Sequence, residues 1–151
     1  MKPVPIAIAA WLLALHLSAA ATEVAYLSEP KRSHVQKVSL ATNPKSYRID
    51  AARHIYESYS SRIYKGRLPP LIHAVVVLET TVDEQGRPRE VKVVRGPSHA
   101  PDVTAAVREM TFRVGPLPLP SKLGAPVRFI EIWLVHKNGR FQLDALTEGQ
   151  D

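Results

Sequence analysis

Two stretches of the chain space their apolar residues at the interval of an amphipathic helix. The first stretch carries Ile49, Ala52, Tyr56, Tyr59 and Ile63 at intervals of three and four positions. The second carries Val103, Ala106, Val107 and Met110. Such spacing places the apolar side chains on one face of a helix. Ser46 or Asp50 is expected to cap the first helix, and Ser98 or Asp102 the second.

Other stretches have the composition and alternation of strands. Residues 73–82 are dense in Val, Leu and Thr, and alternation puts one set on a single face: Ala74, Val76, Leu78, Thr80 and Val82. Residues 90–95 alternate as well, with Val91 and Val93 expected to face inward and Lys92 outward. Residues 83–86 between them have turn composition, so the two stretches are predicted to form an antiparallel hairpin.

A second hairpin is predicted near the end of the chain. Residues 127–136 are the most apolar strand, and Asn138-Gly139 separates them from residues 141–145. Asn-Gly between two such stretches is the strongest short hairpin signal. A two-residue turn would set three pairs opposite each other: His136 with Phe141, Leu134 with Leu143, and Ile132 with Ala145.

The order helix, hairpin, helix, hairpin predicts an α+β fold. We expect a two-layer sandwich with an antiparallel sheet of three to four strands and two helices on one face. The domain is expected over residues 46–145, with a frayed polar tail at 146–151. Residues 22–45 have no sustained period and are predicted to be a linker, with a short extended piece at 35–40. The prolines of residues 115–120 predict a stiff connection from the second helix to the third strand.

Residues 1–21 have the order of parts of a secretory signal. Lys2 is followed by an apolar stretch, and the small-residue run 18–21 fits cleavage before Thr22. An uncleaved anchor is the alternative, although residues 3–21 barely reach the roughly 20 residues that a membrane-spanning helix needs. We therefore expect a periplasmic protein, and with an uncleaved anchor an inner-membrane protein that faces the periplasm.

Composition narrows the function classes. The chain has no cysteine, which excludes disulfides, thiolate metal sites, cysteine nucleophiles and a lipid anchor on an N-terminal cysteine. Its net charge of +6 favours contact with anionic surfaces or acidic segments. The basic residues are spread along the chain without interleaved aromatic residues, so no nucleic-acid partner is expected.

No catalytic motif for hydrolysis, phosphate binding or dinucleotide binding occurs in the sequence. The histidines of the predicted domain fall on different elements without ligand spacing: His54, His73, His99 and His136. Glu79 and Glu131 lie on strands, where Arg or Lys can pair with them across the sheet. We therefore expect no enzyme activity, no catalytic residues, no metal and no cofactor. These histidines are the sole support for the remaining enzyme class, a small hydrolase.

Several motifs together suggest a family. The strand that ends at residues 82–86 is followed by the valine-rich residues 91–95, then by Gly96-Pro97-Ser98, Pro101-Asp102 and Ala105-Ala106-Val107. With the tyrosine-rich helix before them and the proline-rich exit, apolar strand and Asn138-Gly139 after them, these motifs resemble the C-terminal domain of TonB/TolA-type energy transducers. The resemblance runs from Tyr47 to about Ala145.

The resemblance implies binding, not catalysis. Such domains dock onto an extended segment of an outer-membrane transporter, which adds a strand beside the last main strand. Here the resemblance implies a partner-binding edge formed by six residues: Val127, Arg128, Phe129, Ile130, Glu131 and Ile132. Arg128 and Glu131 are expected to give polar selectivity, and residues 141–145 are expected to compete for the edge.

We therefore expect a periplasmic module that captures an extended segment of an envelope or outer-membrane protein by β-augmentation. The alternative is a structural or assembly subunit of an envelope complex that acts as a homodimer, including a strand-exchanged one, because long apolar edge strands invite swapping. Membrane contact is expected only if residues 1–21 stay uncleaved. Residues 22–46 span at most about 85 Å, less than the longer spacer of the family's transducers, so unaided force transmission is not expected.

Overall fold

The computed structural model describes residue 30 and residues 35–150, so the predicted signal at residues 1–21 lies outside the described residues. The sheet is four-stranded and antiparallel, in the order β2-β1-β3-β4. Its strands are β1 (Ala74–Val82), β2 (Pro88–Arg95), β3 (Val127–Val135) and β4 (Phe141–Leu143).

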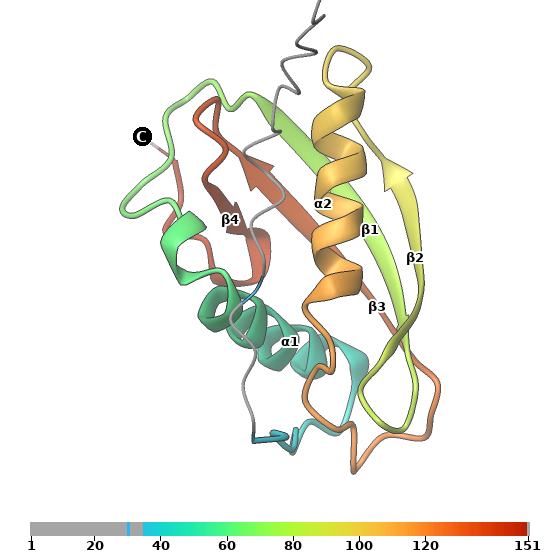
Figure 1. Ribbon diagram of the computed structural model, residues 1–151. Helices are drawn as coiled ribbons and strands as arrows, with labels where there is room; N and C mark the ends of the chain where they lie inside the picture. Colours follow the sequence, from blue (N-terminus) through green and yellow to red (C-terminus); the bar gives the residue numbers. More distant parts are fainter. Residues whose placement is uncertain (1–29, 31–34, 151) are drawn as a thin grey trace, which may run out of the picture.

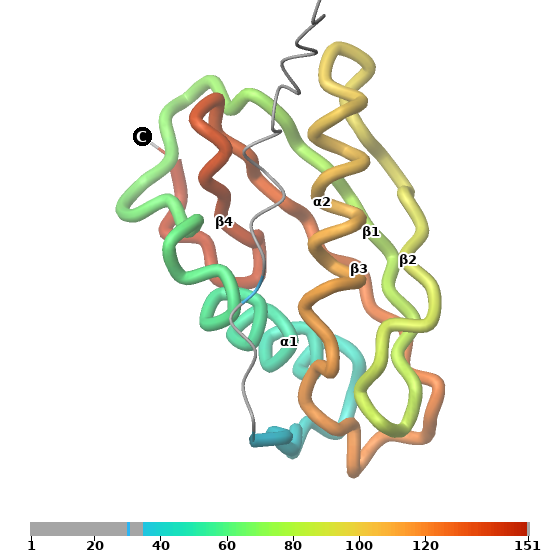
Figure 2. The backbone as a smooth tube through the Cα atoms, in the orientation of Figure 1, coloured from blue at the N-terminus to red at the C-terminus, as the bar shows by residue number. Residues whose placement is uncertain are grey.

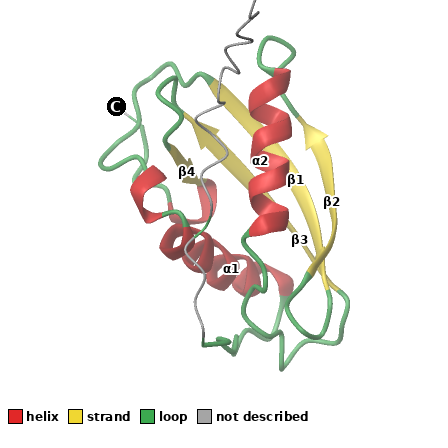
Figure 3. Cartoon of the chain, viewed as in Figure 1, coloured by secondary structure: helices red, strands yellow, loops and turns green. Residues whose placement is uncertain are grey.

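Helices α1 (Pro44–Ser58) and α2 (Pro101–Arg113) both cover the same face of the sheet (Figure 1; Figure 3). Two short 3-10 turns complete the fold, η1 (Ser60–Arg62) after α1 and η2 (Asp144–Leu146) after β4. The predicted α+β two-layer sandwich is confirmed. No helix within residues 35–150 combines the length and the apolar character needed to cross a membrane.

Helix α1 begins earlier than its apolar spacing predicts. The side-chain oxygen of Asn43 accepts the N–H of Ser46 at 2.9 Å, and Pro44 occupies the first turn, where a missing N–H costs nothing. The predicted caps Ser46 and Asp50 are therefore wrong, since both lie inside the helix. The buried stripe also differs: Ile49 and Tyr56 are half-buried, and the buried residues of α1 are Tyr47, Ala51, Ala52, His54, Ile55 and Ser58.

Helix α2 has the predicted buried stripe but not the predicted cap. Its four expected core residues are all buried: Val103, Ala106, Val107 and Met110. Ala100 precedes the helix and makes no side-chain cap bond. Asp102 lies in the first helical turn instead, where a negative charge still favours the positive end of the helix dipole.

Aromatic contacts join the two layers within a core that is otherwise mainly aliphatic. Trp133 of β3 and Phe141 of β4 have ring centroids 4.5 Å apart, and Tyr47 of α1 meets Phe129 of β3 edge-on at 5.7 Å. The Tyr47 hydroxyl donates to the carbonyl oxygen of Pro118 at 2.7 Å, so this buried polar group is satisfied. The predicted inward set of β1 is buried as expected: Ala74, Val76, Leu78, Thr80 and Val82.

The proline-rich connection from α2 to β3 holds two other segments (Figure 2). The Leu117 N–H donates to the Gly86 carbonyl at 2.7 Å. Gly86 has φ +75°, and a Cβ there would lie 2.1 Å from the Leu117 oxygen, so the β1–β2 turn requires glycine. Val38 forms a parallel bridge with Leu119, which makes the predicted extended piece part of the packed domain, ahead of the expected boundary at residue 46.

The β3–β4 hairpin forms as predicted, but its two-residue turn is wrong. The observed pairs are Val135 with Phe141, Leu134 with Gln142 and Trp133 with Leu143. The longer turn is closed by the His136 N–H, which donates to the Arg140 carbonyl at 2.8 Å. Shifting the register by one residue turns a side chain to the other face of a sheet. The observed register places Phe141 and Leu143 beside Trp133 and Val135, on the helix-covered face.

Strand β4 is shorter than predicted, and the tail after it is packed. The strand ends at Leu143 because η2 begins at Asp144, so the predicted pairing of Ile132 with Ala145 is wrong. The Leu68 N–H donates to the Gly149 carbonyl at 2.9 Å. The tail from residue 146 to 150 is therefore held against the domain instead of being frayed.

Candidate functional site

One side of β3 is only partly covered. Strand β1 pairs with β3 along its whole length, whereas β4 pairs only with Trp133, Leu134 and Val135. No strand within residues 35–150 pairs with residues 127–132 on that second side. We call this stretch of β3 the open edge, and all six predicted partner-binding residues lie on it.

The backbone groups of the open edge alternate in direction. The His136 N–H points across the hairpin to Arg140, and backbone groups of every second residue of a strand point to the same side. The N–H and C=O groups of Arg128, Ile130 and Ile132 therefore face away from β1. Those of Arg128 and Ile130 are the unpaired groups that an added strand would use.

The side chains of the open edge lie on two faces. Val127, Phe129 and Glu131 face the helices and are buried. Ile130 is 47% exposed on the opposite face, and Arg128 there lies 3.8 Å from the Glu79 carboxylate. Arg128 is therefore accessible for the polar selectivity predicted from the sequence. Glu131, which is 1% exposed, faces the interior.

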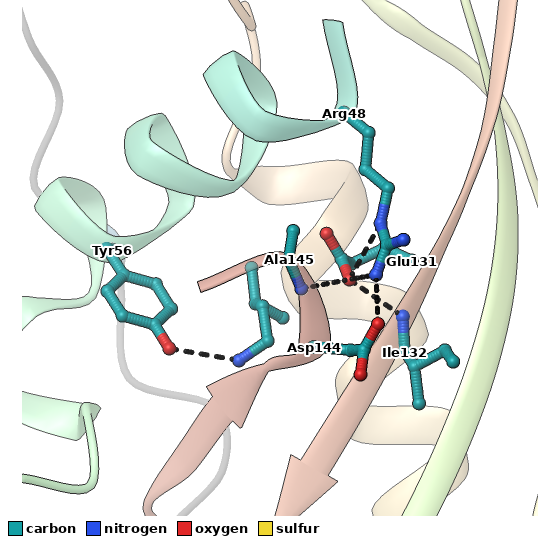
Figure 4. Close-up of polar contacts among 7 residues, drawn as sticks. Arg48, Tyr56, Glu131, Ile132, Asp144 and Ala145 are labelled. Atoms are coloured by element: carbon teal, nitrogen blue, oxygen red, sulfur yellow. Dashed lines mark hydrogen bonds and ion pairs between the residues drawn. The ribbon is translucent and has the colours of Figure 1, made fainter. Parts of the chain in front are cut away.

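Glu131 sits at the point where β4 leaves β3 (Figure 4). Its Oε1 atom accepts from the Nη2 of Arg48 at 2.9 Å and from the N–H of Ile132 at 2.9 Å. The same Arg48 nitrogen lies 2.7 Å from the Asp144 carboxylate. The N–H of Ala145 reaches Oε1 at 3.4 Å. This carboxylate thus connects α1, β3 and η2.

The ion pair with Arg48 satisfies the buried Glu131 carboxylate only in part. Burial raises the pKa of Glu131, and its hydrogen bond and charge interaction with Arg48 oppose that rise. The Oε2 atom is buried and has no hydrogen-bond partner within the described residues. Burying a carboxylate without a cation nearby costs several kcal/mol of folding free energy. Arg48 is the residue that offsets this cost for Glu131.

Two side chains bond the backbone where β4 ends. The carboxylate of Glu131 takes the N–H of Ile132, and the hydroxyl oxygen of Tyr56 in α1 accepts the N–H of Leu143 at 3.0 Å. Burial raises the pKa of Tyr56, so this hydroxyl stays neutral near neutral pH. The open edge consequently offers both backbone groups of Arg128 and Ile130, whereas the N–H of Ile132 is already bonded.

A groove of about 360 Å³ lies beside the open edge. The first turn of α1 lines one side with Pro44, Lys45 and Arg48. The sheet lines the other side with Glu79, Arg128, Phe129 and Ile130. Lys45 is exposed and forms no ion pair with any described residue. The unpaired strand therefore lies next to a concave surface with a free positive charge.

A second groove, of about 330 Å³, lies between α1 and the extended piece. Its charged side chains are already paired: Lys37 with Glu57, and Arg53 with Asp50 at 3.2 Å. His54 is buried, its Nε2 lies 3.3 Å from the Val114 carbonyl, and burial lowers its pKa. The acids and bases of this groove are therefore neutralised in pairs.

The structure brings two of the scattered histidines together. The Nε2 of His99 lies 2.7 Å from the carbonyl oxygen of His73, and the two rings are 5.6 Å apart. His136 lies beside Tyr64 at the β3–β4 turn, far along the sequence from both. Across the described part of the chain, no three His, Asp or Glu side chains converge as a metal would require.

Sequence reasoning missed Arg48 and Lys45. Arg48 lies next to Ile49 in the predicted helix, but nothing in the sequence marks it as a partner of a residue in β3. The available signal was Glu131, a carboxylate in the middle of the most apolar strand, because a buried acid requires a cation or several donors nearby. Locating that cation needs the packing of α1 on β3.

Comparison with known proteins gives no match: no protein-family model, no curated protein and no solved structure matches the chain. The resemblance to the TonB/TolA-type C-terminal domain therefore stays a prediction.

Proposed function

We propose that this chain is a periplasmic protein-binding module that captures an extended segment of an envelope or outer-membrane protein. The segment is added to the sheet as a strand along the open edge. The observation that carries the proposal is that β4 stops at Leu143 and leaves residues 127–132 unpaired on one side. An unpaired edge supplies backbone donors and acceptors for β-augmentation.

The contrast with the other outer strand supports the proposal. Proteins protect strand edges with charges and bulges, and β2 has both. Its register with β1 is interrupted twice, and it carries Glu90, Lys92 and Arg95. The open edge pairs with β1 without any register shift and places Ile130 at its centre. The edge of β2 is protected and the open edge of β3 is not.

The family resemblance supports the class of partner. TonB/TolA-type domains are expected to receive a strand beside their last main strand, and β3 is the corresponding strand here. The order of motifs and the signal-like residues 1–21 together favour an envelope protein as the partner. The alternative that a second copy of this chain adds its own β3 uses the same open edge, so molar mass by light scattering at high concentration separates the two occupants.

A proline at Ile130 tests the proposal. The Ile130 N–H faces away from β1, so proline there removes no hydrogen bond between β1 and β3, and edge positions of this kind tolerate it. We expect peptides selected from a random phage-displayed library against the full chain to lose binding to Ile130→Pro. Circular dichroism of the variant should keep the helical signal.

The matched control is Val93→Pro in β2. The Asp83 N–H donates to the Arg87 carbonyl, so the odd-numbered residues of β1 face β2, and the N–H of Val93, which lies opposite Leu78, faces away from β1. This proline therefore changes the other outer edge without removing a hydrogen bond between β1 and β2. Selected peptides should bind Val93→Pro as they bind the wild type. If they bind Ile130→Pro equally well, the open edge is not where the chain captures peptides and the proposal fails.

A further inference from the structure

We infer that the strand bound at the open edge alternates acidic and aliphatic side chains, with the acidic ones toward α1. This inference rests on the proposed function and specifies the chemistry of the bound segment. Successive side chains of a strand point to opposite faces of the sheet. A strand added beside β3 therefore presents one set of side chains to the first turn of α1 and the other set to the uncovered face.

The side toward α1 is positively charged. Lys45 and Arg48 line the groove there, and the N-terminal end of a helix carries a partial positive charge. Arg48 is already bound by Glu131 and Asp144. Lys45 has no ion-pair partner in the described part of the chain, so it is the cation left for a guest carboxylate.

The opposite side carries two aliphatic side chains of β3. Ile130 is among the exposed large apolar residues, and Ile132 lies two positions further on the same face of β3. Across the sheet, Ile132 pairs with Val77 of β1, which extends the apolar surface inward. Aliphatic side chains on a neighbouring strand stabilise such a surface through cross-strand contacts.

The charged residues on that opposite side do not compete for the guest. Arg128 and Glu79 lie 3.8 Å apart and offset each other's charge. A guest side chain on this face therefore meets apolar surface next to an already paired acid and base. Arg128 and Glu79 line the same groove as Lys45, but only Lys45 lacks an ion-pair partner among the described residues. Its place in the first turn of α1 sets the direction in which the two kinds of side chain alternate.

The extent of the ladder is also limited. The Ile132 N–H is held by Glu131, and η2 follows β4 directly, so the guest strand cannot continue past Ile132 without displacing that bond. A ladder along residues 127–132 is about 20 Å long at roughly 3.3 Å per residue. The bound segment is thus about six residues, with two or three acidic side chains facing α1.

Three labelled heptapeptides test the inference by fluorescence anisotropy against the full chain. One alternates Glu and Val, one alternates Lys and Val, and one has the composition of the first with its Glu residues grouped at one end. We expect the alternating Glu-Val peptide to bind at least fivefold more tightly than either of the others. Lys45→Glu should weaken its binding about fivefold, as expected for reversal of one exposed charge contact.

Lys137→Glu is the matched control, because it makes the same change in net charge at the exposed β3–β4 turn. It should change binding of the Glu-Val peptide by less than about twofold. If Lys45→Glu and Lys137→Glu weaken binding equally, the preference reflects overall charge and the inference is overturned. Equal binding of the grouped peptide would overturn it as well.

The outcomes also separate this inference from the proposed function. If all three peptides bind alike and Ile130→Pro abolishes their binding, the open edge captures strands but without the stated alternation. If none of the three binds while library peptides still depend on Ile130, the inference fails and the proposed function stands. If library peptides ignore Ile130→Pro, the proposed function fails first.

Discussion

The two halves of β3 have the same neighbour on one side and different neighbours on the other. Trp133, Leu134 and Val135 lie between β1 and β4. Strand β4 is itself covered, because the N–H of Tyr64 donates to the Phe141 carbonyl at 2.9 Å. Residues 127–132 have β1 alone. One half is an interior strand, and the other half is an edge.

Side-chain burial follows the same division. Trp133 packs on Phe141, and the rings of Tyr56 and Tyr59 also meet Phe141 edge-on, each at 6.4 Å. In the open half, Ile130 leaves nearly half of its surface in solvent. The closed half thus supplies aromatic packing that stabilises the fold. The open half leaves its outward backbone groups free at little cost to stability.

The boundary between the halves is an ion pair. Glu131 and Arg48 meet at the residue where β4 departs, and Asp144 anchors η2 to the same arginine. The strand that follows the Asn-Gly turn is therefore stopped after three residues by polar contacts at this boundary. This stop is what leaves the open edge uncovered.

The largest expected effect is on stability, in the half of β3 that β4 covers (residues 133–135, the closed half). Phe141→Ala removes the ring that Trp133, Tyr56 and Tyr59 contact, and truncation of a buried aromatic residue typically costs about 3–5 kcal/mol. Ile130→Ala, the matched truncation in the open half, should cost about 1 kcal/mol or less. Urea unfolding of both variants measures the difference. Equal losses would mean that the two halves contribute alike to stability, and the comparison would fail.

The alternation of apolar residues was enough to predict most of the fold. It located all four strands and assigned the inward face of β1 and the buried stripe of α2. The register of β3 with β4 was not predictable from Asn138-Gly139 alone, because that pair marks a turn without fixing its length. Here the Asn138 side chain accepts the Arg140 N–H at 3.0 Å, which belongs to a longer turn.

The start of α1 was missed for a local reason. Asn43 and Pro44 fall within the predicted linker of residues 22–45, although Asn before a proline at the first helical position is a helix start. The candidate site was likewise predictable only in part. The resemblance predicted which residues form the partner-binding edge, but it did not predict that β4 ends early and leaves that edge open. The Arg48–Glu131 contact joins residues far apart in the chain, and only tertiary packing determines it.

The next largest expected effect is on the pH dependence of stability, through Glu131 at the boundary between the two halves of β3. Burial raises the pKa of Glu131 above its ordinary value of 4.5, so the folded protein holds this proton more tightly than the unfolded chain does. The stabilising contribution is complete below about pH 4.5 and is lost as the pH rises through the higher folded value. Glu131→Gln cannot titrate. Its stability should therefore rise relative to the wild type across that window.

Urea unfolding of both proteins from pH 4 to pH 8 measures this gap. Arg48→Met sharpens the test, because Arg48 holds the Glu131 pKa down; without it, the loss of stability should move to higher pH. A gap between wild type and Glu131→Gln that does not change with pH would show that Glu131 titrates alike in both states. The boundary would then depend on geometry alone.

The smallest effect is on individual amide protons, and it resolves the two halves residue by residue. The N–H groups of Phe129 and Glu131 face β1, whereas those of Arg128 and Ile130 face the open side. Amide exchange followed by NMR should therefore alternate in the open half, with Arg128 and Ile130 exchanging at least about tenfold faster than their neighbours. In the closed half, Trp133 and Leu134 should both be protected.

Amide exchange at Ile132 tests where the open half of β3 ends. Its N–H is bonded to the Glu131 carboxylate and to no strand, so its protection should fall in Glu131→Ala while that of Leu134, bonded across the hairpin to β4, stays. Adding a peptide that binds the open edge should slow exchange at Arg128 and Ile130 and leave Trp133 unchanged. Uniform protection along residues 127–135 in the free protein would mean that another segment already covers this side of β3, and capture of a partner strand would then require its displacement.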